Sequence, residues 1–144
     1  MSGKFAKGKY TLKFPAKYVG INMPMYRSSW EFSFMHMCDT NPNILKWASE
    51  SIHINYKNPF TNKQTIYVPD FFVLYMDANN RQHAELWEIK PTKETTLEAA
   101  GRSKKAQAAA ILNACKWQAC QAWCKANNLT FRIVTEKDIF HQGK

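Results

Sequence analysis

One stretch, residues 67–91, constrains the fold more than any other part of this 144-residue chain. It contains two runs of β-branched, aromatic and aliphatic residues, separated by the polar sequence DANNR at residues 77–81. Such runs are typical of β-strands, and short polar residues between them are typical of a hairpin loop. The stretch therefore predicts two β-strands joined by a polar turn.

Three charged side chains interrupt these apolar runs, namely Asp70 in the first and Glu88 and Lys90 in the second. Side chains alternate along a strand, so Glu88 and Lys90 share one face, and pairing around the turn brings Asp70 near them. Desolvating unpaired charge costs roughly several kcal/mol. A divalent cation held by Asp70 and Glu88, with Lys90 beside it, explains why these charges gather on an apolar sheet.

Length and composition indicate one globular domain that is long enough to bury a core, with 45% hydrophobic and 14% aromatic residues. No apolar run approaches the ~20 residues of a membrane span, and the Lys-rich start lacks the apolar segment of a signal peptide. We therefore expect a protein that is neither secreted nor membrane-bound. Its four cysteines are then expected to be reduced.

The formal net charge is +9, from 20 Lys and Arg against 11 Asp and Glu. This excess favours a polyanionic partner, nucleic acid before membrane. Residues 1–25 contain no acidic residue and are interpreted as a basic N-terminal arm, followed by one domain at 26–144. Lys7, Lys9 and Lys13 of the arm are candidate DNA contacts; docking on a partner protein or a frayed terminus are the alternatives.

A first helix is expected from Ser28 to just before Pro42, because Ser28 and Glu31 form a capping-box pattern and Pro42 closes the segment. The Glu31 carboxylate then has two interpretations. It bonds back to the Ser28 amide as a helix cap, or it is a third acidic group aimed at the metal. The sequence leaves both open.

The remaining segments predict the order α-β-β-β-α-β. Residues 44–48 predict a short turn or helix, whereas the alternation over 50–56 predicts the first strand of three joined by hairpins. Residues 103–127 lack Pro and Gly and are rich in Ala, Lys and Gln, which strongly favours a long helix. Residues 129–134 predict a fourth strand, and Thr135 caps an expected short helix at 138–140.

This order places Pro69-Asp70, then seventeen residues, then Glu88-Ile89-Lys90 on the middle strands, and in this it resembles the PD-(D/E)xK nuclease superfamily. Within it the chain is most similar to the small phage head completion nucleases, with TnsA-type endonucleases as cousins. The similar stretches lie between residues 26 and 139 and exclude the first 25; they are YRSSWEFSFMHMCDTNPNILKWASE, YVPDFFV, ELWEIKP and FRIVTEKDI. The resemblance implies an α/β, restriction-endonuclease-like αβββαβ core, with a mixed four-stranded sheet flanked by helices.

The resemblance also implies a Mg²⁺-dependent (or Mn²⁺-dependent) deoxyribonuclease, a chemistry for which oxygen ligands are suited. Asp70, Glu88 and the backbone carbonyl of Ile89 would bind the metal. Lys90 would orient the attacking water or stabilise the charge of the transition state. Glu31 would bind a second metal or a metal-bound water.

In related nucleases a polar residue of the second long helix often reaches the site. Lys104 and Gln107 are the candidates here, and together with Lys105 they would hold DNA phosphates. The implied role is processing of the DNA end at the phage head, in the host cytoplasm or on the virion. DNA, portal or neck proteins and a second copy in a homodimer are the implied partners. The alternatives are a TnsA-like or junction-resolving endonuclease, and a structural head or neck protein that binds DNA or portal.

Overall fold

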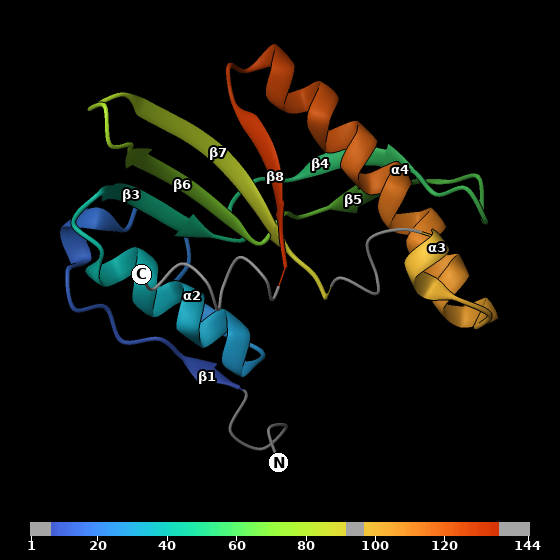
Figure 1. The fold of residues 1–144 in the computed structure, drawn as a ribbon, viewed down its shortest axis with the longest axis horizontal. Coiled ribbons are helices and arrows are strands. Elements are labelled where there is room, and N and C mark those ends of the chain that lie inside the picture. The colour runs from blue at the N-terminus through green and yellow to red at the C-terminus, as the bar shows by residue number, and fades with distance from the viewer. Residues whose placement is uncertain (1–6, 92–96, 136–144) are drawn as a thin grey trace.

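A mixed four-stranded sheet forms the centre of the computed structural model (Figure 1). Its strands run in the order β3 (Ile44–Ser49), β6 (Phe71–Met76), β7 (Gln82–Ile89) and β8 (Thr130–Val134). The β3–β6 and β6–β7 pairs are antiparallel, and β8 lies parallel to β7. This α/β arrangement confirms the expected restriction-endonuclease-like fold.

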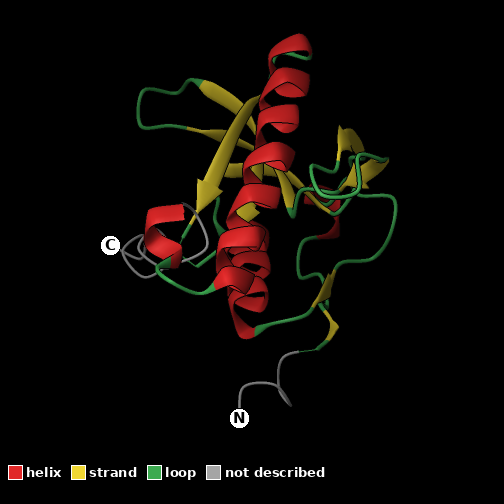
Figure 2. Cartoon of the chain, turned by 90° about the vertical axis from the view of Figure 1, so that its right-hand side faces the viewer, coloured by secondary structure: helices red, strands yellow, loops and turns green. Residues whose placement is uncertain are grey.

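Two long helices cover opposite faces of the sheet, because consecutive residues of its strands point to opposite sides. Helix α2 (Ser29–Thr40) packs on the face that contains Trp87, and α4 (Lys104–Ala126) packs on the face that contains Leu86. Figure 2 shows α4 running along the sheet in front of its strands. The side chains that α2 buries are Phe34, Met35 and Cys38, and those that α4 buries include Trp117, Cys120 and Cys124.

The first strand of the sheet was wrongly predicted. Residues 44–49, expected as a turn or short helix, are the edge strand β3, and the fully buried Trp47 pairs there with Val73. The segment predicted as the first strand instead forms β4 (Ile54–Lys57), which pairs with β5 (Gln64–Tyr67) in a separate hairpin. A short apolar run does not distinguish strand from helix by its periodicity, and pairing with β6 decides the matter here.

The other elements follow the prediction closely. Ser28 caps α2 and Ser103 caps α4, each through a side-chain oxygen that accepts a backbone N–H three residues on. A four-residue helix, α3 (Leu97–Ala100), lies in the connection expected to be a loop. The structure describes residues 7–91 and 97–135, and the expected helix at 138–140 lies outside them. No helix within the described residues is long and apolar enough to span a membrane.

Residues 7–25 of the expected arm are folded against α2 and β3. Strand β1 (Gly8–Lys9) pairs with β2 (Met25–Tyr26), a 3-10 turn, η1, forms at Pro15–Lys17, and Val19 N donates to Trp47 O at 2.9 Å. The ring of Tyr10 lies in the core beneath α2, with 3% of the residue exposed. The segment is therefore part of the folded unit rather than a frayed end.

Candidate active site

The ends of β6 and β7 bring the three charged residues of the motif together. Asp70 immediately precedes β6, and the pairing of Phe71 with Trp87 places it beside the end of β7. There the Ile89 amide donates to Asp70 Oδ2 at 2.7 Å. Glu88 and Lys90 lie on the same side, with Lys90 Nζ 3.8 Å from Glu88 Oε2. The sheet register thus brings Asp70 to Glu88 and Lys90, although these two residues follow it by 18 and 20 positions in the sequence.

Glu88 is a buried carboxylate with specific partners. It is 6% exposed, and Tyr67 Oη donates to its Oε1 at 2.7 Å. Burial raises the pKa of Glu88 because the charged form loses water. The Tyr67 hydroxyl and the positive charges of Lys90 and Lys116 act in the opposite direction and favour the carboxylate.

Asp70 adds a second carboxylate to the same buried place. Burial raises its pKa well above the ordinary value, and the negative charges of Glu88 and Glu31 raise it further. The Ile89 amide and Lys90 offset part of this effect. Two neighbouring carboxylates whose pKa values are both raised make the free site electrostatically unfavourable, and a cation between them would relieve this repulsion.

The donor set fits a hard divalent cation. Tyr67 Oη donates to Glu88 Oε1, Lys90 Nζ lies 3.8 Å from Glu88 Oε2, and the Ile89 amide donates to Asp70 Oδ2, so these contacts hold both carboxylates in place. Oxygen donors of this kind suit Mg²⁺ or Mn²⁺. Within the described residues no three His, Cys, Asp or Glu side chains gather around one point, so further ligands would come from backbone oxygen or water. The Ile89 carbonyl stays the predicted backbone ligand.

Glu31 lies at the start of α2, close enough to Asp70 for its charge to act there. Its Oε1 accepts a hydrogen bond from the Arg27 amide at 2.8 Å, not from the Ser28 amide of a standard capping box. Ser28 itself caps the helix by accepting from Glu31 N at 3.1 Å. The carboxylate therefore bonds to the Arg27 amide in place of the expected Ser28 amide, and metal binding by Glu31 stays a prediction.

An ion pair between Arg27 and Glu50 lies near Asp70, and no sequence pattern predicted it. The Arg27 guanidinium binds both carboxylate oxygens of Glu50, with Nη2 3.0 Å from Oε1. Glu50 directly follows β3 in a left-handed conformation, φ 49°, and its amide donates to the Asp70 carbonyl at 3.0 Å. Arg27 is half-exposed, and its ion pair with Glu50 holds it near the carboxylates. Glu50 reaches this end of the sheet because residues 44–49 form β3, a strand that the sequence periodicity did not predict.

Helix α4 contributes Lys116 to the surroundings of the site. Its Nζ lies 5.8 Å from the ring centroid of Tyr67, and its charge lowers the pKa of Glu88. The predicted Gln107 instead donates through Nε2 to the Gly101 carbonyl at 2.7 Å. Lys104 lies twelve residues before Lys116, about 18 Å along the helix axis. Lys104 and Gln107 stay predictions, and Lys116 is a further candidate on the same helix.

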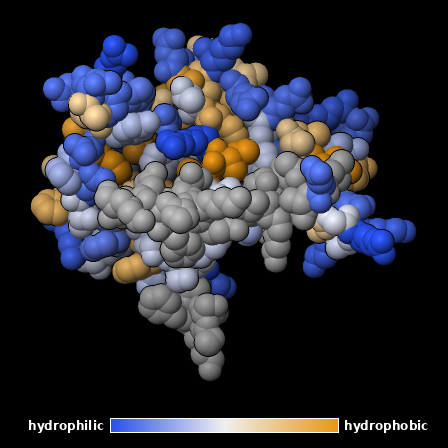
Figure 3. Space-filling view, in the orientation of Figure 1, coloured by the Kyte–Doolittle hydropathy of each residue, from blue (hydrophilic) through white to orange (hydrophobic). Residues whose placement is uncertain are grey.

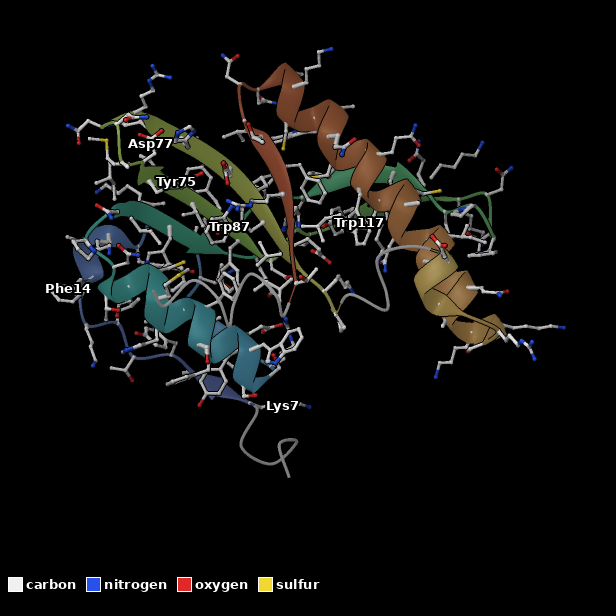
Figure 4. The ribbon with its side chains drawn as sticks, viewed as in Figure 1. Lys7, Phe14, Tyr75, Asp77, Trp87 and Trp117 are labelled. Atoms are coloured by element: carbon white, nitrogen blue, oxygen red, sulfur yellow. The ribbon has the colours of Figure 1, made fainter. Side chains whose placement is uncertain are left out.

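The predicted DNA-contacting lysines fall into two groups. Lys104 and Lys105 are exposed in the first turn of α4, and hydrophilic side chains cover the margins of this face of the molecule (Figure 3). Lys7, Lys9 and Lys13 are exposed along the N-terminal segment, and Figure 4 labels Lys7 beside β1. Their contact with DNA stays a prediction.

Known proteins resemble this chain in sequence. The family model described as "TnsA-like endonuclease N terminal" matches residues 41–136, which contain Asp70, Glu88 and Lys90. The chain belongs to the TnsA-like endonuclease family. It is also 33% identical over 142 residues to the head completion nuclease of Enterobacteria phage T4, with 92% of each chain covered. A match that covers 92% of the chain includes part of residues 1–25, whereas the resemblance that we predicted from the sequence began at residue 26.

Proposed function

We propose that this protein is a divalent-metal-dependent DNA endonuclease that hydrolyses phosphodiester bonds during phage head completion. The single observation that carries the proposal is the convergence of the half-buried Asp70 and the buried Glu88, both carboxylates of raised pKa, with Lys90 Nζ 3.8 Å from Glu88 Oε2. Perturbed titratable groups gathered in this way favour a functional site. The endonuclease family supplies the reaction class.

The chain's own residues would divide the work. Asp70, Glu88 and the Ile89 carbonyl would hold Mg²⁺ or Mn²⁺, which supplies Lewis-acid stabilisation of the phosphoryl oxygens and a lowered pKa for water. Lys90 would orient the attacking water or stabilise charge that develops on the phosphate. Tyr67 holds Glu88 in one orientation through its hydroxyl, and Glu31 adds negative charge beside the metal site.

The setting of the reaction is proposed from the T4 relative. The name of that relative, head completion nuclease, supports a role in processing the DNA end at the phage head. In that setting the partners are DNA and portal or neck proteins. Cutting both strands of a duplex would call for a homodimer or for two successive cuts.

The family model supports a second candidate, because its description names TnsA-like endonucleases. Such an enzyme would cut DNA in a transposition or junction-resolving system rather than at a phage head. Cleavage of branched DNA in preference to linear ends would favour this candidate. A phage-head role predicts cleavage of protruding linear ends.

Cleavage of supercoiled and linear DNA with Mg²⁺ or Mn²⁺, against EDTA, tests the proposal. The Asp70→Asn/Glu88→Gln double variant keeps the shape of the site and removes both charges, whereas Glu98→Gln removes one exposed charge on α3 as a control. We expect metal-dependent cleavage that the control retains and the folded double variant loses. A folded wild type that binds DNA without cutting any form would instead indicate a structural head protein.

A further inference from the structure

A groove of about 400 Å³ lies between the N-terminal segment and helix α2, outside the carboxylate site. It has the size of a small-molecule site rather than of a surface irregularity. The groove is lined by Lys9, Tyr10, Thr11, Lys13, Phe32 and His36.

The groove combines positive charge with an aromatic floor. Lys9, Lys13 and His36 are exposed on its walls, and none of the described lining residues is acidic. On the floor the half-buried Phe32 packs edge-on against Tyr10, with ring centroids 5.7 Å apart. Cationic side chains around an aromatic face are the usual components of a site for single-stranded nucleic acid.

The walls of the groove are held in place by a buried carboxylate. Asp39, which is 0% exposed, accepts hydrogen bonds from Tyr10 Oη at 2.8 Å, Lys13 N at 2.7 Å and Phe14 N at 3.0 Å. Lys17 Nζ donates to the Asp39 carbonyl at 2.9 Å. The lysine-bearing segment is therefore ordered before any ligand binds, so binding does not incur the cost of ordering it.

The groove shares helix α2 with Glu31. Phe32 follows Glu31, whose charge acts on Asp70. His36 lies five residues beyond Glu31 on the same helix, about 7.5 Å along its axis.

We propose that this groove binds an unpaired nucleotide of the DNA strand next to the cut, with the base on Phe32 and the flanking phosphates at Lys9 and Lys13. The proposal deepens the proposed function and rests on it. An unpaired base is required because a duplex presents only phosphates and base edges, whereas an aromatic floor contacts a base face. A DNA end with a single-stranded overhang is the substrate class that supplies such a nucleotide.

Fluorescence anisotropy with a labelled oligo-dT of about 12 nucleotides, in EDTA, measures binding without cleavage. Lys9→Gln/Lys13→Gln is compared with Lys63→Gln/Lys125→Gln, which removes the same charge from exposed positions outside the groove. Each phosphate contact contributes about 0.7 to the slope of log K against log salt for single strands. We expect the groove variant to lower this slope by about 1.4, and the control to leave it close to the wild-type value.

Phe32→Leu tests the base contact separately. We expect it to weaken oligo-dT binding about tenfold and to leave binding of a blunt duplex unchanged, since stacking requires an exposed base. A groove variant that behaves like the control, or equal loss of single-strand and duplex binding in Phe32→Leu, overturns the proposal. If Phe32→Leu does not fold, the exposed lysine pair decides alone. Wild-type cleavage with Mg²⁺ is measured on the same preparation, so that failure of the groove and failure of the nuclease function give different results.

Discussion

Asp39 offers the sharpest test of how the N-terminal segment is held. Its two carboxylate oxygens accept from two different backbone amides, Oδ2 from Lys13 N and Oδ1 from Phe14 N, and Oδ2 also accepts from Tyr10 Oη. An Asn side chain has the same shape but offers one oxygen and one NH₂ group. In either orientation of the amide, Asp39→Asn leaves one buried backbone N–H facing another donor.

The cost follows from these contacts. An unpaired buried N–H costs about 1–3 kcal/mol, and each remaining hydrogen bond loses about 1 kcal/mol when its acceptor is no longer charged. The sum is roughly 3–5 kcal/mol, against about 5–15 kcal/mol for the unfolding of a whole domain. For a chain of this size that corresponds to a fall in Tm of about 8–15 °C.

Urea unfolding followed by circular dichroism measures the difference in free energy. Lys13→Ala is the matched control, because it removes an exposed side chain and keeps the backbone N–H that Asp39 accepts. We expect this control to lie within about 0.5 kcal/mol of the wild type. A loss below about 1 kcal/mol in Asp39→Asn, or an equal loss in Lys13→Ala, refutes the reasoning.

Three further predictions concern the carboxylate site. Because burial raises the pKa values of Asp70 and Glu88, the stability they contribute is complete below about pH 4 and is lost as pH rises through the raised values. Urea unfolding in EDTA between about pH 4 and 8 should therefore show a smaller decline for Asp70→Asn than for the wild type, and parallel curves would contradict this. Tyr67→Phe should lower cleavage about 10–100-fold in a folded protein, since Glu88 loses the group that orients it; wild-type rates would exclude that role. Lys116→Met should move the acidic limb of the pH–kcat/KM profile to higher pH, because the charge of Lys116 lowers the pKa of Glu88. Lys104→Met is the control and should leave the profile unchanged. Equal profiles for the two variants would show that Lys116 does not act on Glu88.

One experiment tests whether the hydrogen bonds of Asp39 are needed for DNA to bind in the proposed groove. If Asp39 holds the groove walls, Asp39→Asn should weaken oligo-dT binding at a temperature where the variant is still folded. Such a result would show that Asp39, a structural carboxylate far in sequence from Asp70 and Glu88, contributes to the affinity for single-stranded DNA.

Local signals in the sequence determined much of this protein. The alternation of side chains around the turn at residues 77–81 was enough to place Glu88 and Lys90 on one side and Asp70 near them. Caps at Ser28 and Ser103 fixed where α2 and α4 begin. The caps depend on neighbours three residues apart, and the hairpin joins strands that follow one another directly in the chain, so both can be predicted without the rest of the fold.

Only the tertiary structure decided which segments meet across the chain. Residues 44–49 became the edge strand because they pair with β6, and Glu50 thereby reached Asp70. The charge of Lys116 acts on Glu88 because the packing of α4 on the sheet sets which turn of the helix faces the site. A basic segment that composition describes as an arm is folded because a buried carboxylate, Asp39, accepts its backbone amides. Each of these contacts joins residues more than 15 positions apart, and no local periodicity encodes such a pairing.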